Sequence, residues 1–181
     1  MDDNEKVTLR RYTRNVYCSG VGFILFGAWD AVKYMMTLYS ESNDPDGDMR
    51  NALIALGNYW FLLYFILLIV AAIILIFHIL VGRGAMNFAQ GKTEKKRFLI
   101  VAYIILIATL LSLPFYFITG SIKNEVISII EWLNTFEGNF SQLPPGAVSI
   151  ASFLTDLTMI YLMSDMIYST GKVTKLRVGA K

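Results

Sequence analysis

Long runs without a charged side chain alternate along this chain with short segments rich in charge. No Lys, Arg, Asp or Glu lies in the 32 residues between Arg50 and Arg83, or in the 25 residues between Arg97 and Lys123. A helix of about 20 apolar residues is enough to cross the hydrocarbon core of a bilayer. Each run is therefore long enough to form a transmembrane helix.

Two further apolar segments have a similar length but contain charged residues within them. Together with the uncharged runs they predict four membrane spans, at about 16–39, 52–81, 98–119 and 145–169. The predicted fold is an all-α integral membrane protein, a four-helix transmembrane bundle that forms a single domain over 1–181.

Positive charge is concentrated in the tail before the first span, in the connection between the second and third spans, and in the C-terminal tail. The basic residues of these three segments are Lys6, Arg10, Arg11, Arg14, Arg83, Lys92, Lys95, Lys96, Arg97, Lys172, Lys175, Arg177 and Lys181. The only basic residues of the other two connections are Arg50 and Lys123, and those connections also contain several acidic residues. Because cytoplasmic flanks are enriched in Lys and Arg, we expect both termini in the cytoplasm and the protein in the cell membrane.

The stretch between the third and fourth spans shows helical periodicity. Its apolar residues recur mostly at spacings of three or four, at Ile122, Val126, Ile129, Ile130, Leu133 and Phe136. This pattern is too polar to cross a bilayer and predicts an external amphipathic helix over about 121–137. The helix would rest on the membrane surface or act as a lid over a pore. A glycosylation sequon at Asn139 lies on the same predicted side.

Composition excludes several classes of protein. Of the 181 residues, 55% are hydrophobic and 17% are charged, against about 25% charged in soluble domains. So short a chain cannot bury that apolar excess in a water-soluble globule. An ordinary cytosolic enzyme, a disordered tail and a disulfide scaffold are therefore excluded.

Four charged residues lie inside the predicted spans: Asp30, Lys33, Asp156 and Asp165. Each costs about 2.5–3.5 kcal/mol near the centre of a bilayer, so each needs a partner or water. Asp30 and Lys33 are three residues apart on one helix, close enough to pair. At about 1.5 Å per residue, Asp30 and Asp156 lie at nearly the same depth. We predict one buried cluster of Asp30, Lys33 and Asp156.

Asp165 belongs to the opposite face of its helix from Asp156, because nine residues at about 100° each bring it halfway round. His78, the only histidine, is predicted at a similar inner depth. A second pair of His78 and Asp165 is one interpretation. In the other, Asp165 reaches solvent or a basic residue of the tail, and His78 bonds a backbone carbonyl.

Small residues favour close helix contacts in the first and fourth spans. They are Gly20, Gly22, Gly27 and Ala31 in the first span, and Ala147, Ala151 and Thr155 in the fourth. Small side chains let membrane helices approach closely. The two helices are expected to pack on each other, although a homo-oligomer or a partner membrane subunit would use the same pattern.

The sequence does not predict a metal site, a haem site, a catalytic site or a nucleic-acid site. One histidine and one cysteine are too few for a zinc or haem site, so neither a metal nor a cofactor is predicted. No catalytic residues are identified, and the basic residues are explained by topology rather than by nucleic acid. The basic run at 92–97 has a second interpretation, the attraction of anionic lipid headgroups at the bilayer surface.

Two classes of function follow from the intramembrane charges. Asp30, Lys33 and Asp156 could line a path for an ion or solute, or could pair helices in a non-catalytic membrane subunit or interaction protein. Ionisable groups inside a membrane are functional candidates by default. Small transporter- or channel-like permeation is therefore the favoured prediction, and an enzyme is not expected.

Overall fold

The structure, a computed structural model, describes residues 2–43, 51, 53–55, 57, 60–118, 126–127, 130 and 147–179. Four long helices dominate these residues: α1 (Asp3–Asn43), α3 (Trp60–Ala89), α4 (Arg97–Ile118) and α6 (Ala147–Gly179). No strand occurs among the residues described. The all-helical prediction is confirmed for them. The predicted amphipathic helix at 121–137 lies almost entirely outside them.

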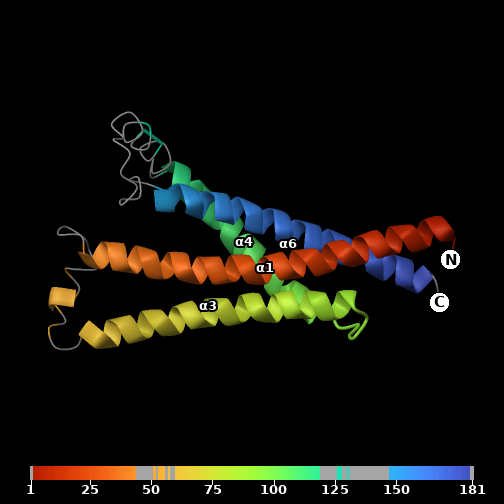
Figure 1. The fold of residues 1–181 in the computed structure, drawn as a ribbon, viewed down its shortest axis with the longest axis horizontal. Helices are drawn as coiled ribbons and strands as arrows, with labels where there is room; N and C mark the ends of the chain where they lie inside the picture. The colour runs from red at the N-terminus through yellow and green to blue at the C-terminus, as the bar shows by residue number, and fades with distance from the viewer. Residues whose placement is uncertain are drawn as a thin grey trace, which may run out of the picture.

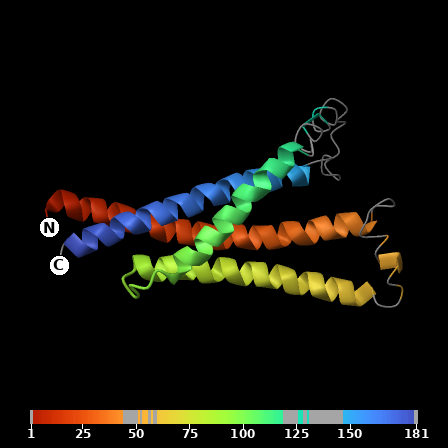
Figure 2. The same ribbon diagram turned by 180° about the vertical axis from the view of Figure 1, so that it is seen from behind.

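The helix α1 runs through the middle of the molecule, with α3 along one side and α6 along another (Figure 1). Seen from behind, α4 crosses obliquely from the end of α3 to the start of α6 (Figure 2). The most extensive helix contacts are those of α1 with α3 and with α6. Both termini lie at one end of the molecule, and the chain runs up and down between the two ends.

Three of the helices are long and apolar enough to cross a membrane. The qualifying segments are Tyr64–Ala89 in α3, Arg97–Pro114 in α4 and Ile150–Gly179 in α6. The helix α1 does not qualify, and Asp30 and Lys33 interrupt its apolar part. The prediction of a membrane protein is thus supported by three helices, and the fourth crossing stays a prediction.

The outer surfaces of these helices carry large apolar side chains. The following are more than half exposed within the chain: Phe65, Leu80, Ile100, Ile104, Leu111 and Leu154. A soluble monomer rarely exposes apolar surface on this scale. In a bilayer the same side chains face lipid at no cost.

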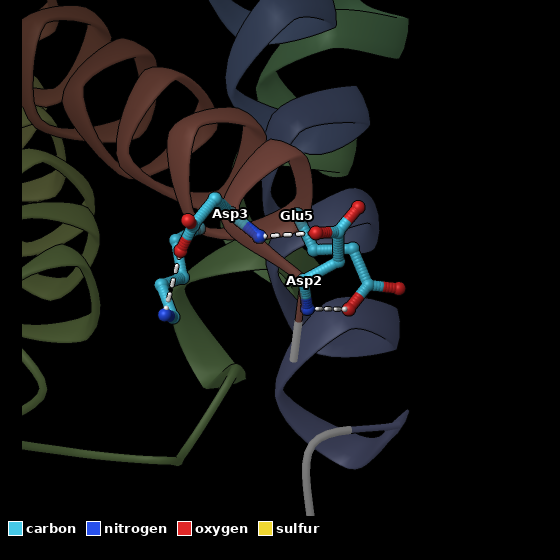
Figure 3. A network of polar contacts seen from close by, with 4 residues as sticks. Asp2, Asp3 and Glu5 are labelled. Atoms are coloured by element: carbon cyan, nitrogen blue, oxygen red, sulfur yellow. Dashed lines mark hydrogen bonds and ion pairs between the residues drawn. The ribbon is translucent and has the colours of Figure 1, made fainter.

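The helix α1 begins at Asp3, so the polar N-terminal tail is itself helical. The backbone N–H of Asp2 donates to Oε2 of Glu5 at 3.1 Å, and Lys6 pairs with Asp3 at 2.8 Å (Figure 3). This return contact is one half of a capping box. The acidic first turn also complements the positive end of the helix dipole.

The C-terminal end of α3 is closed by a glycine turn. Gly91 has a φ of 74°, and its N–H donates to the carbonyl of Phe88 at 3.1 Å, while Lys92 N–H donates to the carbonyl of Asn87 at 2.9 Å. This is a Schellman motif, which needs a residue in the left-handed region. Glycine adopts that region without steric cost.

Arg177, near the end of α6, reaches the same helix end. Its Nη1 and Nη2 donate to the carbonyls of Phe88 and Ala89 at 3.3 and 3.4 Å. The guanidinium also lies 5.0 Å from the centre of the Phe88 ring. Arg177 therefore joins α6 to the end of α3 with its positive charge at the negative end of the helix dipole.

Small residues bring α1 against α3. A Cβ added to Gly20 would lie 2.9 Å from the carbonyl oxygen of Gly82, so the two backbones nearly touch there. Gly22 instead faces α6, where its nearest neighbour is the side chain of Leu162. The expected contact between α1 and α6 is present. Among the glycines of these helices, however, the contact with backbone atoms of another helix is made between α1 and α3, at Gly20 and Gly82.

Candidate functional site

Asp30 and Lys33 form an ion pair on α1. The Lys33 Nζ lies 3.0 Å from Asp30 Oδ1, and the two side chains are only 16% and 20% exposed. Their spacing of three residues places both on neighbouring positions of one helix surface. The structure thus brings together two of the three residues predicted to form the buried cluster.

His78 of α3 lies against the same part of α1 and is 5% exposed. A Cβ on Gly27 would overlap the Cβ and Cγ of His78, so only glycine leaves room for the ring. The imidazole stacks on Phe23, with ring centres 4.8 Å apart and planes at 27°. Phe23, Gly27 and Asp30 follow one another at spacings of four and three, which places them on one helix face.

The two ring nitrogens of His78 have different surroundings. Nδ1 lies 2.8 Å from the carbonyl oxygen of Ile74. Because a carbonyl only accepts, Nδ1 is the nitrogen that donates a proton. Nε2 is buried without a hydrogen-bond partner and lies 3.9 Å from Asp30 Oδ2. In a neutral ring, Nε2 therefore turns its lone pair toward a carboxylate oxygen.

A proton can bind between Nε2 of His78 and Oδ2 of Asp30. Two acceptors that face each other repel, whereas a proton on Nε2 of His78 makes the same contact a charge-assisted attraction to Asp30. Lys33 pairs with the other carboxylate oxygen, so the three groups together are neutral before uptake and carry one positive charge after it. Proton exchange between the imidazole and the carboxylate is the chemistry that this geometry allows.

Asp156 lies on α6 at a similar level. A hydrogen bond between Ser19 and Asp165 shows which residues of the antiparallel helices α1 and α6 lie at the same level. Asp30 follows Ser19 by 11 residues and Asp156 precedes Asp165 by nine, which are about 16.5 and 13.5 Å along the two axes. The half-buried Asp156 is thus nearly level with Asp30. Its part in a shared cluster stays a prediction.

Asp165 has partners of its own. Ser19 Oγ donates to its Oδ2 at 2.9 Å and Ser169 Oγ donates to its Oδ1 at 3.2 Å. Both hydroxyls are buried, and each carboxylate oxygen has a donor.

The structure does not bring His78 and Asp165 together. His78 contacts α1 at Gly27, eight residues beyond Ser19, where Asp165 is bound. Eight residues correspond to about 12 Å along a helix. The interpretation in which His78 bonds a backbone carbonyl agrees with the structure, and its contact with Asp30 was not anticipated.

The chain matches no known protein-family model, and no curated protein or solved structure is significantly similar to it. Its function must therefore be argued from geometry and chemistry alone.

Three grooves at other places have volumes of about 460, 300 and 240 Å³. They are lined by residues toward the end of the molecule that carries the termini, and neither Asp30 nor His78 lines any of the three. Basic side chains border each of them: Arg10 and Arg14, Lys95 and Arg97, and Lys96 and Arg177 respectively. The polar contacts between α1 and α3 are thus separate from these grooves.

Proposed function

We propose that this protein is a small transporter- or channel-like membrane protein whose permeation step binds a proton between Asp30 and His78. The observation that carries the proposal is the buried Nε2 of His78, which has no hydrogen-bond partner and faces Asp30 Oδ2 at 3.9 Å. An imidazole nitrogen that carries no proton can accept one, and a carboxylate beside it stabilises the proton once bound. A pair of this kind at membrane depth can bind and release a proton.

Lys33 has a defined part in this proposal. Its ammonium balances the charge of Asp30 at 3.0 Å and so lowers the cost of keeping a carboxylate inside the bundle. When a proton joins the pair, Lys33 gains a like-charged neighbour and is released toward another acceptor. Asp156, nearly level with Asp30 on α6, is the acceptor that we propose, and it would extend the polar path across the bundle.

The proposed path requires α1 to cross the membrane with the three apolar helices. Support comes from the course of the chain, in which α1 lies between α3 and α6 and runs along the same long axis as both of them (Figure 1). Both termini lie at the end toward which most basic residues are placed. By the preference of cytoplasmic flanks for Lys and Arg, we propose that this end is cytoplasmic and that the membrane is the cell membrane.

A second function, that of a non-catalytic membrane subunit, is favoured by a different observation. An apolar stripe on α1 stays exposed within the chain, formed by Leu25, Trp29, Val32 and Met36 at spacings of four, three and four. In this role the buried charges hold the chain's own helices together, and the stripe meets a partner helix or a second copy of the chain.

Proton flux into proteoliposomes tests the first function. Purified protein is reconstituted with a trapped pH-sensitive dye, and a potassium gradient with valinomycin drives proton entry. We expect Asp30→Asn and His78→Gln to lose most of the flux. The matched control is Asp165→Asn, which alters a half-buried acid that has separate partners and should retain the flux.

Flux that equals that of protein-free liposomes in the wild type contradicts permeation. The subunit role then predicts that Trp29→Ala with Val32→Ala changes the oligomeric state in detergent, whereas Asp30→Asn lowers thermal stability. Equal flux in the wild type and in all three variants would show that permeation does not use this site.

A further inference from the structure

A groove at the junction of α3 and α4 combines an apolar floor with positive charge at its mouth. Its volume is about 300 Å³, at the lower limit of about 300–1,000 Å³ for small-molecule sites. The floor includes Leu80, Phe98 and Val101, and the mouth includes Thr93, Lys95 and Arg97.

The groove lies beside a close contact between the two helices, beyond which they diverge. A Cβ on Gly84 would lie 2.6 Å from the Cβ of Phe98, so α3 and α4 are in contact there. Beyond this contact α4 crosses away from α3 (Figure 2). The groove lies where the helices diverge, and Leu80, which lines it, is 59% exposed.

The groove is basic at one end and apolar at the other, so it matches the charged headgroup and the apolar acyl chain of a phospholipid. Arg97 begins the membrane-compatible segment of α4, which places its guanidinium at the surface of the bilayer. Val101 lies one turn further into the apolar segment, about 6 Å away. The first turn of α4 holds no acidic residue, and Glu94, which directly precedes Lys95, lines the neighbouring groove rather than this one. Lys95, Arg97 and the positive end of the helix therefore make this groove positive.

We infer that this groove binds one anionic phospholipid. The phosphate lies between the side chains of Lys95 and Arg97, with the hydroxyl of Thr93 beside it, and one acyl chain follows the floor past Val101 toward Leu80. The basic residues supply the complementary charge, and the exposed apolar floor supplies a surface that a soluble anion would not use. This site lies apart from Asp30 and His78 and does not depend on the proposed permeation.

Native mass spectrometry of the full chain in detergent tests the site with two probes, phosphatidylglycerol and phosphatidylcholine of the same acyl composition. The wild type should bind one phosphatidylglycerol more tightly than phosphatidylcholine. Lys95→Gln with Arg97→Gln should weaken phosphatidylglycerol binding roughly 25-fold, from about fivefold per basic side chain near a membrane surface. The matched control, Lys172→Gln with Lys175→Gln, removes the same charge outside the groove and should leave binding unchanged.

A second variant tests the contribution of the acyl chain to binding separately from that of the basic charges. Val101→Trp fills the floor and keeps both basic residues, so it should also lose the bound phosphatidylglycerol. Equal weakening by the two double variants would show a general electrostatic effect and overturn the inference. Equal affinity for both lipids, or complete displacement of phosphatidylglycerol by inorganic phosphate at the same concentration, would also overturn it.

Discussion

The contact between Gly27 and His78 holds the proposed proton site together, and Gly27→Ala tests it. An added Cβ would overlap the Cβ and Cγ of His78 and lie 2.7 Å from its Cδ2. The Cβ and Cγ are fixed close to the α3 backbone, so the ring cannot swing away as the end of a flexible side chain can. Either α1 and α3 separate, or His78 leaves its place beside Asp30.

The size of the effect follows from the cost of overpacking, about 1–3 kcal/mol. For a chain of this length, 1 kcal/mol corresponds to about 2–4 °C in Tm. We therefore expect Gly27→Ala to lower the Tm by roughly 2–12 °C and to reduce proton flux as well. Tryptophan fluorescence during heating in detergent measures the first effect, since the chain has three Trp residues.

Two glycines provide graded controls for this prediction. A Cβ on Gly171 meets nothing within 4 Å, and alanine in a helix is favoured over glycine by about 1 kcal/mol, so Gly171→Ala should keep or raise the Tm. A Cβ on Gly22 meets Leu162 Cδ1 at 3.2 Å, the end of a flexible side chain, so Gly22→Ala should have a small effect. A Gly27→Ala protein as stable as Gly171→Ala would show that the contact between Gly27 and His78 does not constrain the packing of α1 on α3.

Two further predictions concern the half of the molecule that carries the termini. Ser19→Ala removes the donor to Asp165 Oδ2. Because the carboxylate is half-buried, we expect a loss of about 1 kcal/mol, at the low end of the cost of an unsatisfied acceptor. Thermal unfolding should show this loss, and Cys18→Ala, at an exposed neighbour, should not. Arg177→Gln removes the guanidinium that bonds the last carbonyls of α3 and should speed hydrogen exchange near Gly179. Lys175→Gln is its control, and equal exchange in the two variants would contradict the joining role of Arg177.

The sequence predicts the helices well where charge is absent. The uncharged runs coincide with most of α3 and α4, because burial in lipid demands an unbroken apolar surface. The polar ends of α1 and α6 lack such a signal, so their continuation to Asp3 and to Gly179 was not foreseen. Asp2 and Glu5 have the spacing of a capping box, and this signal could have extended α1 to its true start.

The candidate site, too, is only partly predictable from the sequence. The pair of Asp30 and Lys33 follows from spacing within one helix, which needs no knowledge of packing. The position of His78 depends on where α3 ends. A predicted end at Val81 put His78 close to the inner surface, whereas the helix continues to Ala89 and carries His78 two turns deeper, to the level of Gly27.

Of the two partners of Asp165, only one follows from spacing along the chain. Ser169 lies four residues further along the same helix, so its contact was readable from spacing. Ser19 lies on another helix, and the register between α1 and α6 is set by packing across the whole interface. No pattern along the chain specifies that register.

Because His78 is the only histidine, ¹⁵N-histidine labelling reports on this ring alone. Solid-state NMR of the labelled wild type and of labelled Asp30→Asn, both in lipid bilayers, measures which ring nitrogens carry protons and whether Nε2 senses the carboxylate. Proton binding between Asp30 and His78 requires a ring that is protonated at Nδ1, as the contact with the Ile74 carbonyl indicates, and an Nε2 signal that shifts when the carboxylate is removed. A ring that carries its single proton on Nε2, or an Nε2 signal that is the same in both proteins, would contradict this site.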